Sequence, residues 1–336
     1  MKRKIILVTG GAGYIGSHTI VELIQAGYEV ISVDNFLNSD PKVFTQIEKI
    51  TGRKIKNYSI DISDRNQVFS KLLISKPIYA VIHFAAKKSV PESVADPLVY
   101  YKNNIQSLVN ILDFCKRKNI SNFIFSSSCS VYGDIQKSPV SEKSPVGKTL
   151  SPYAETKKMA ERIIEDYTLS YNSKSVILRY FNPAGVHPSL LIGDSGSGQN
   201  QGVTPILVKS ILRNTTFSIF GDTYKTRDGT AVRDYVHVSD IAYAHVLALR
   251  NFSLKSNFDI INLGAGKGVT VLELVSAFER LLKMKINYKI LPKRYGDIAS
   301  VYASNNKAKR VLGWKPKYTL RDIIETSYSW EKKNNE

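Results

Sequence analysis

A tyrosine and a lysine four residues apart are the first candidates for chemistry in this 336-residue chain. Tyr153 and Lys157 follow Ser151 and Pro152, a favourable N-cap and a favourable first helical residue. The segment 151–172 is therefore predicted to be a helix that carries both side chains on one face. A free tyrosine, with a pKa near 10, is a poor base at neutral pH. Positive charge from Lys157 would favour the phenolate, so we expect a general base whose pKa the lysine lowers.

A run of serines precedes this helix and offers a second polar group. Ser126, Ser127 and Ser128 come at the end of the apolar segment 121–126, which is predicted to be a strand. In a parallel sheet, ligands bind at the carboxyl ends of strands. We expect Ser128 to relay a proton between substrate and Tyr153. For each single serine, a polar strand exit with redundant hydroxyls is the alternative.

A glycine-rich turn near the N-terminus predicts where a nucleotide would bind. Gly10, Gly13 and Gly16 follow the apolar run at 5–9 and open a helix predicted over 14–27. This order of strand, turn and helix is typical of a dinucleotide pyrophosphate site. Asp34 lies 18 residues after Gly16 and ends a second apolar run, where an acid accepts hydrogen bonds from ribose hydroxyls and repels a 2′-phosphate. The pattern favours NAD over NADP, and the cationic nicotinamide would lower the pKa of Tyr153 further. A structural turn in an unrelated α/β protein is the alternative.

The elements around these residues alternate between strands and helices. Strands are predicted at 4–9, 28–33, 57–60, 79–84, 121–126 and 174–180, and helices at 14–27, 64–75, 97–118 and 151–172. This alternation predicts an α/β fold with a Rossmann-type, doubly wound parallel sheet over residues 1–180.

After residue 181 the pattern changes, and residues 181–336 are predicted to form a smaller, mixed α/β substrate domain. An irregular loop is expected over 187–203, and a strand at 216–220. Helices are expected at 204–213, 240–249, 270–283, 304–312 and 319–332. The apolar run 258–263 could return to the main sheet, and the active site is expected in the cleft between the two domains.

Composition limits the other classes of function. The formal charge of +18 comes from scattered Lys and Arg rather than from a basic stripe, so we expect no nucleic-acid partner. No apolar run approaches the length of a membrane span. Cys115 and Cys129 are interpreted as free thiols in a reducing, cytoplasmic compartment. The five histidines have no metal-ligand spacing, and no metal site is expected.

Taken together, these motifs resemble the extended short-chain dehydrogenase/reductase family. The resemblance rests on the segment 9–16, the Ser128/Tyr153/Lys157 set and the segment 179–183. It extends through the more specific segments 228–238 and 262–266. Within the family the chain is similar to enzymes that invert C4 of UDP-hexoses, interconverting UDP-glucose and UDP-galactose.

The resemblance implies a mechanism with tightly bound NAD. Tyr153 would take the proton of the sugar 4-hydroxyl while C4 passes a hydride to NAD. Lys157 would hold the nicotinamide ribose, and Ser128 would bridge substrate and tyrosine. The 4-keto sugar would then turn over and receive the hydride on its other face, regenerating the cofactor.

Two sets of binding residues follow from the same resemblance. The positions that match cofactor contacts are Gly10, Gly13, Tyr14, Ile15, Gly16, Asp34, Asn35, Asn38, Asp61, Ile62, Phe84, Ala85, Lys88, Asn103, Tyr153, Lys157 and Phe181. Those that match UDP-sugar contacts are Ser128, Tyr153, Asn182, Val203, Phe220, Arg233, Tyr235, Arg294, Asp297 and Val301. Arg233 and Arg294 suit a diphosphate because guanidinium groups donate in a fork, and Phe220 could pack on uracil.

The chain departs from the family pattern at two places. An Asn often precedes the helix that opens near Thr204, whereas Gln201, Gly202 and Val203 occupy that stretch here. Val301 stands where some members carry a bulky Tyr, and a small residue leaves room for an N-acetyl group. We therefore expect turnover of UDP-GlcNAc and UDP-GalNAc as well.

The alternatives within the family are a 4,6-dehydratase, a decarboxylase and a uronate epimerase. Cys129 and Ser130 occupy the place of the acidic pair that a dehydratase needs. A non-catalytic, nucleotide-binding regulator is disfavoured because Tyr153 and Lys157 are both present. The resemblance also implies a homodimer formed by helices 97–118 and 151–172.

Overall fold

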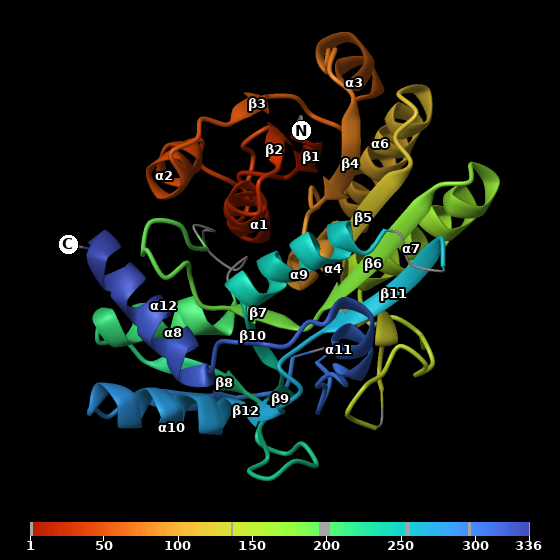
Figure 1. Ribbon diagram of the computed structural model, residues 1–336. Coiled ribbons are helices and arrows are strands. Elements are labelled where there is room, and N and C mark those ends of the chain that lie inside the picture. The colour runs from red at the N-terminus through yellow and green to blue at the C-terminus, as the bar shows by residue number, and fades with distance from the viewer. Residues whose placement is uncertain (1–2, 136, 195–201, 253–255, 295–296, 336) are drawn as a thin grey trace.

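A parallel seven-stranded sheet forms the centre of the computed structural model, which describes residues 3–135, 137–194, 202–252, 256–294 and 297–335 (Figure 1). The strand order is β11-β6-β5-β4-β1-β2-β3. The strands are β1 (Ile5–Thr9), β2 (Glu29–Val33), β3 (Lys56–Tyr58), β4 (Ile78–His83), β5 (Asn122–Ser128), β6 (Lys174–Tyr180) and β11 (Phe258–Leu263). Apart from the edge strand β3, which is only partly buried, their central residues are largely apolar and buried, as a parallel sheet covered on both faces requires.

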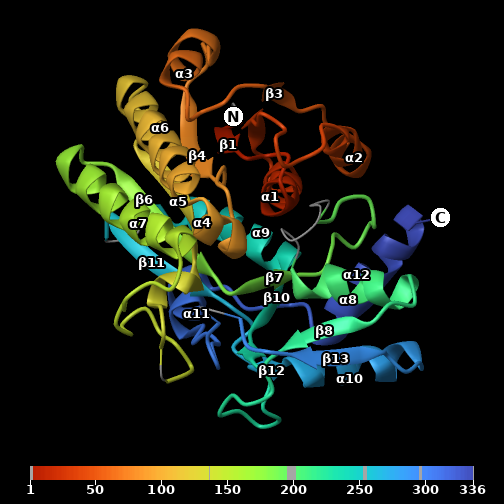
Figure 2. The ribbon, with the colours of Figure 1, turned by 180° about the vertical axis from the view of Figure 1, so that it is seen from behind.

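Helices cover both faces of this sheet (Figures 1 and 2). One face packs against α1 (Tyr14–Gln25), α2 (Lys42–Thr51), α9 (Val238–Arg250) and α11 (Asn306–Leu312). The other packs against α3 (Arg65–Lys71), α6 (Gln106–Arg117) and α7 (Pro152–Ser170). The two faces are separate apolar clusters, with Ile20 and Ile241 in the first and Ile111 and Ile164 in the second. The prediction of a doubly wound α/β fold is confirmed.

The connection after β4 is helical almost throughout. It consists of α4 (Val90–Ala95), α5 (Pro97–Tyr100), the π-helical segment η1 (Tyr101–Ile105) and then α6. The helix predicted over 97–118 is therefore interrupted by a wider turn. Asn104 in η1 bonds to the backbone N and O of Lys87 and to Thr156 Oγ1 at 2.8, 3.0 and 3.1 Å. The π-helical segment thus ties the end of β4 to α7.

The chain beyond β6 builds a third apolar cluster, away from the two faces of the main sheet (Figure 2). Its helices are α8 (Val203–Leu212), α10 (Val271–Leu282) and α12 (Leu320–Asn335). Its short strands pair as β7 (Asn182–Ala184) with β10 (Tyr235–His237), β8 (Phe217–Phe220) with β13 (Tyr288–Leu291), and β9 (Val232–Arg233) with β12 (Val269–Thr270). Only the β9–β12 pair is antiparallel among the pairs described. The second part of the chain is thus mixed α/β, as predicted.

Several element boundaries differ from the sequence prediction. The helix expected over 64–75 ends at Lys71, and α2, α4, β7, β9, β10, β12 and β13 were not predicted. A single-turn 3₁₀ helix, η2 (Cys129–Tyr132), follows β5. The strands that were not predicted have two to four residues and form only against distant partners, so local sequence carries little signal for them. Gln201 and the part of the expected loop at 195–201 lie outside the described residues.

Candidate active site

The carboxyl ends of β1, β2, β4, β5 and β6 lie at one edge of the sheet. β1 is the point where the strand order reverses, between β2 and β4. The backbone N of Gly10 donates to Val33 O at 2.8 Å, and Phe84 N donates to Thr9 O at 3.0 Å. The loops after three neighbouring strands are therefore fastened together at the position where doubly wound sheets bind ligands.

Gly13 and Gly16 have different roles where the first loop meets α1. A Cβ on Gly16 would lie 2.1 Å from Gly10 O, so this glycine is needed for the loop to close on α1. A Cβ on Gly13 would meet only Gly10 O, at 3.2 Å. Gly13 is also the N-cap of α1 and supplies no side-chain cap, which leaves the first-turn N–H groups available for an anion. The loop therefore fits a pyrophosphate that approaches Gly13.

Asp34 follows β2 at the carboxyl edge of the sheet and binds the backbone of the glycine loop. Its carboxylate accepts hydrogen bonds from Ala12 N, Phe36 N and Ser39 Oγ, each at 2.9 Å. Oδ2 has one of these donors and Oδ1 has two. A carboxylate can accept about four bonds, so Oδ2 keeps capacity for a ribose hydroxyl.

The other positions expected to contact the cofactor are distributed around this edge. Asn35, Asn38, Asp61 and Ile62 follow β2 and β3, Phe84, Ala85 and Lys88 follow β4, Asn103 lies in η1, and Phe181 follows β6. Asn38 is exposed, and Asp61 Oδ1 accepts bonds from Ser63 N and Oγ at 2.9 and 2.8 Å. Tyr14, which precedes Ile15 in the first turn of α1, donates its hydroxyl proton to Gly185 O.

The candidate catalytic residues lie on β5 and α7. Ser151 caps α7 by accepting from Ala154 N at 3.2 Å, which places Tyr153 in the first turn. Lys157 is 4% exposed, and its Nζ donates to Ser126 O at 2.7 Å. Burial lowers the pKa of Lys157 to about 7, and the charge of Glu161 partly offsets this effect.

The pKa of Tyr153 departs from the sequence-based expectation. Burial raises it to about 12, and a hydrogen bond from Ser128 only partly offsets that rise. The expected lowering by Lys157 is wrong for the protein by itself, because the desolvation of the phenolate outweighs the polar contacts. Further positive charge beside the ring is required before Tyr153 can act as a base near neutral pH.

A buried ion pair that the sequence analysis missed anchors α7 to the sheet. Arg179 on β6 donates from Nε and Nη2 to Glu161 on α7 at 2.9 and 2.6 Å, and the two side chains are 3% and 9% exposed. Ser127 Oγ also donates to Glu161, at 2.5 Å. Arg179 stacks 4.7 Å from the ring centre of Tyr132. Glu161 lies four residues after Lys157, and this spacing is the signal that could have identified it.

The residues expected to hold the UDP group also come together. Arg294 contacts Asp297 at 2.9 and 3.3 Å and lies 4.7 Å from the ring centre of Phe220. Arg233 Nη2 is 3.8 Å from Asp297, and its Nη1 donates to the backbone oxygens of Val232 and Ile298 at 2.9 and 2.7 Å. The guanidinium groups of both arginines thus meet at one carboxylate.

Three buried polar atoms in this region have no partner within the described protein: Asn182 Oδ1, Tyr224 Oη and Tyr235 Oη. Unpaired buried polar atoms are rare, and a polar ligand would satisfy them. Val203 begins α8, and Gly202 is its N-cap without a side-chain cap. Val301 is 3% exposed and belongs to an apolar cluster with Phe181 and Val140.

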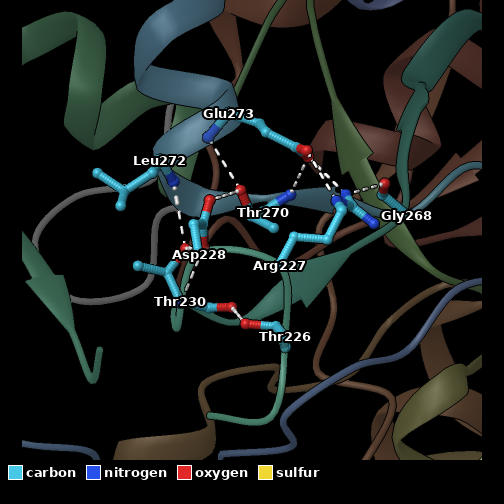
Figure 3. Close-up of polar contacts among 8 residues, drawn as sticks. All are labelled: Thr226, Arg227, Asp228, Thr230, Gly268, Thr270, Leu272 and Glu273. Atoms are coloured by element: carbon cyan, nitrogen blue, oxygen red, sulfur yellow. Dashed lines mark hydrogen bonds and ion pairs between the residues drawn. The ribbon is translucent and has the colours of Figure 1, made fainter. Parts of the chain in front are cut away.

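The loop that carries Tyr224 is fastened to α10 (Figure 3). Arg227 forms a bidentate ion pair with Glu273, at 2.8 and 2.6 Å, and also donates to Gly268 O at 3.0 Å. Asp228 accepts from Thr230 N and Oγ1 and from Thr270 Oγ1. The sequence analysis did not single out Tyr224, because its significance depends on this loop.

Within the described residues there is no cluster of three or more His, Cys, Asp or Glu side chains that could hold a metal ion. None of the described helices is both long enough and apolar enough to cross a membrane.

Comparison with known proteins agrees with this geometry. Residues 6–264 match the NAD dependent epimerase/dehydratase family. The UDP-glucose 4-epimerase of Bacillus subtilis is 43% identical over 331 residues, which make up 98% of this chain and 97% of that protein. The crystal structure of UDP-glucose-4-epimerase from Stenotrophomonas maltophila with bound NAD and formylated UDP-arabinopyranose has a TM-score of 0.94 and 39% identity. It covers 99% of both chains.

A second solved structure is similarly close. The UDP-glucose 4-epimerase of Bifidobacterium longum in complex with NAD⁺ and UDP has a TM-score of 0.93 and 41% identity, and again 99% of both chains are covered. The chain belongs to the NAD dependent epimerase/dehydratase family, within the extended short-chain dehydrogenases/reductases.

Proposed function

We propose that this protein is an NAD-dependent isomerase that interconverts UDP-glucose and UDP-galactose by inverting C4 of the sugar. The observation that carries the proposal is the hydrogen bond between Ser128 and Tyr153, with Lys157 bound to Ser126 O on the same strand. The glycine loop that fits a pyrophosphate follows β1 at the same edge of the sheet. The likeness to UDP-glucose 4-epimerases over nearly the whole chain supports the same activity.

We divide the chain at about residue 180, with residues 1–180 holding NAD and residues 181–336 holding the UDP-sugar. The glycine loop, Asp34 and the loops after β3 and β4 would hold the cofactor through its phosphates and adenosine ribose. Bound NAD supplies a carbon atom that accepts the hydride of sugar C4 and returns it. The division is functional rather than spatial, because β11 pairs with β6 in the main sheet.

Tyr153 would accept the proton of the 4-hydroxyl, with Ser128 between substrate and phenol. A fall in its pKa from about 12 to about 7 corresponds to about 7 kcal/mol of differential stabilisation. The protein by itself therefore keeps Tyr153 as a neutral phenol. The positive charge of a bound nicotinamide would favour the phenolate of Tyr153, so proton abstraction would be coupled to the presence of the hydride acceptor.

The UDP group would be held by the second part of the chain. Arg233 and Arg294 would pair with the diphosphate, with Phe220 against uracil and Asp297 on the uridine ribose. The unpartnered atoms of Asn182 and Tyr235 would bond to the same ligand. Val203 would contribute its backbone at the start of α8, where Gly202 supplies no side-chain contact.

We extend the substrate range to UDP-GlcNAc and UDP-GalNAc. The support is the small side chain of Val301, which is buried against Phe181. A bulky ring at this position would fill the space that a 2-acetamido group needs.

We further propose that the protein is a cytoplasmic homodimer. Seven large apolar side chains on α4, α5, α6 and α7 are 38–76% exposed: Val90, Val94, Leu98, Val99, Val109, Met159 and Leu169. An apolar surface shared by neighbouring helices marks a protein interface. The two cysteines, both free, are consistent with a reducing compartment.

The dimer is tested by gel filtration with light scattering. Leu98→Asp should shift the protein to a monomer, whereas Leu37→Asp, at an equally exposed leucine after β2, should leave the dimer unchanged. A wild-type monomer, or an unaffected Leu98→Asp dimer, would contradict the proposal.

The activity is tested with purified protein and UDP-galactose, without added NAD. Formation of UDP-glucose without net NADH is the expected result, because each cycle regenerates the cofactor. Absence of product even with added NAD would overturn the proposed function, and a dehydratase, a decarboxylase and a uronate epimerase would then be screened by the mass change of each UDP-sugar.

A further inference from the structure

We propose that Ser130 is a positioning residue that fixes the direction of the Ser128 hydroxyl, so that Ser128 donates its proton toward Tyr153. This inference rests on the proposed epimerase function. It assigns a task to a side chain that touches neither cofactor nor substrate in the scheme above.

The geometry begins at the end of β5. Ser128 is the last residue of the strand and the N-cap of η2. Its Oγ accepts hydrogen bonds from two atoms of Ser130, the backbone N at 3.2 Å and Oγ at 3.0 Å. A serine hydroxyl has two acceptor lone pairs and one proton. Ser130 therefore occupies both lone pairs of Ser128, and the proton of Ser128 must be donated elsewhere.

Tyr153 is the group that receives this proton. The hydrogen bond between Ser128 and Tyr153 lowers the pKa of the tyrosine. Because Ser130 occupies both lone pairs of Ser128, Ser128 can take part in this bond only as the donor. The hydrogen bonds thus run in one direction, from Ser130 to Ser128 and from Ser128 to Tyr153.

Without the Ser130 hydroxyl, Ser128 would no longer be restricted to donating its proton to Tyr153. One lone pair of Ser128 would become free, and Ser128 could then accept the Tyr153 proton as readily as donate its own. Accepting from Tyr153 stabilises the neutral phenol and opposes formation of the base. The backbone bond from Ser130 N would persist, so η2 keeps its cap.

The other titratable groups near Tyr153 have pKa values that keep them from titrating together with Tyr153 on the acid side of the pH profile. Cys129 in η2 and Tyr180 on β6 are coupled to it electrostatically. Burial raises the pKa of Cys129 to about 12 and that of Tyr180 higher still. Lys157 on α7, with a pKa of about 7, governs loss of activity toward high pH. The acid limb of the kcat profile therefore reports on Tyr153.

The test compares Ser130→Ala, Ser130→Thr and wild-type enzyme on UDP-galactose. Ser130→Ala should lower kcat about 2- to 13-fold and move the acid limb up by about 0.4–1.1 pH units, with KM unchanged. Ser130→Thr keeps a hydroxyl and should restore both values. Ser144→Ala is the matched control, since Ser144 makes similar hydrogen bonds with Ser141 but none with Ser128.

A second readout separates this inference from the proposed function. The tyrosinate absorbance of the NAD-loaded protein is titrated, with Tyr153→Phe as the blank. Ser130→Ala should raise the pKa of Tyr153 by the same amount even if UDP-galactose is not a substrate. An unchanged tyrosinate titration, or an unchanged acid limb in an active enzyme, would overturn the inference.

Discussion

Replacement of Glu161 by Gln removes the negative charge from a buried pair while keeping the shape of the side chain. Two donors of Arg179 and the hydroxyl of Ser127 converge on the carboxylate within 2.9 Å. An amide offers one oxygen, so at least one donor loses its acceptor. Removing one partner of a buried ion pair costs about 3–5 kcal/mol, because the other charge is left uncompensated.

This cost converts into a measurable change of melting temperature. Unfolding entropy near 60 °C is about 2.1 cal/mol/K per residue, or about 0.7 kcal/mol/K for 336 residues. Glu161→Gln should therefore lower Tm by about 4–7 °C in differential scanning calorimetry. The exposed pair between Arg162 and Asp166 is the control, and Arg162→Gln should lower Tm by less than about 2 °C.

The same substitution should also change the pH dependence of activity. The charge of Glu161 raises the pKa of Lys157, which burial has lowered to about 7. Without that charge Lys157 becomes neutral at lower pH, so the alkaline limb of kcat should move to lower pH. The double variant Glu161→Leu/Arg179→Met should recover much of Tm, because no buried charge is left unpaired, but should leave the alkaline limb displaced.

The melting temperature and the alkaline limb of kcat each test one of the two roles assigned to Glu161. If Glu161→Gln melts no lower than Arg162→Gln, the pair does not stabilise α7 as described. If Tm falls while the alkaline limb stays in place, Glu161 does not act on Lys157.

Four further substitutions test other parts of the site. Tyr153→Phe should fold with an unchanged Tm and lose about 10²–10⁴-fold in kcat, since the ring remains but the proton acceptor is gone; near-wild-type turnover would contradict the mechanism. Gly13→Ala should keep Tm but purify with little NAD, whereas Gly16→Ala should lower stability by about 1–3 kcal/mol; absorbance of released NAD and thermal denaturation distinguish the two. Val301→Tyr should abolish turnover of UDP-GlcNAc and spare that of UDP-galactose, and a wild-type enzyme inactive on both N-acetyl sugars would refute the wider substrate range.

The turns, strands and helix starts that the sequence predicted are those that depend on residues close together in the chain. Gly10, with a positive φ, and Gly16, with no room for a Cβ, mark a backbone path that other residues do not readily follow. Ser151 with Pro152 marks the start of α7. Six of the seven sheet strands in the described residues were predicted in the first 180 residues, because their apolar runs are bounded by turns. Each of these features depends on a few neighbouring residues.

The features that were missed depend on distant partners. β9 and β12 have two residues each and pair with one another, and β9 also pairs with Ser300. The π-helical turn at 101–105 follows from the bonds of Asn104 to two other segments. Tyr224 becomes notable only once its loop is fastened to α10 (Figure 3).

The direction of the Tyr153 pKa could not be predicted from residue types. Spacing placed a lysine one turn away and indicated a lowered pKa. Desolvation of the phenol, which arises from the packing of several segments at the sheet edge, raises the pKa instead. Sequence thus indicated a candidate base but not the direction in which the protein by itself shifts the pKa of that residue.

The position of β11 at the edge of the sheet has a consequence for synthesis of the chain. β6 ends at Tyr180, and its partner β11 begins at Phe258, about 80 residues later. At about 5–20 residues per second, the ribosome needs roughly 4–16 s to make that stretch. During this interval the outer edge of β6 has no strand beside it, and such an edge is a template for pairing with another chain. The nascent protein is therefore most exposed to self-association on polysomes, before the second half of its ligand site has been made.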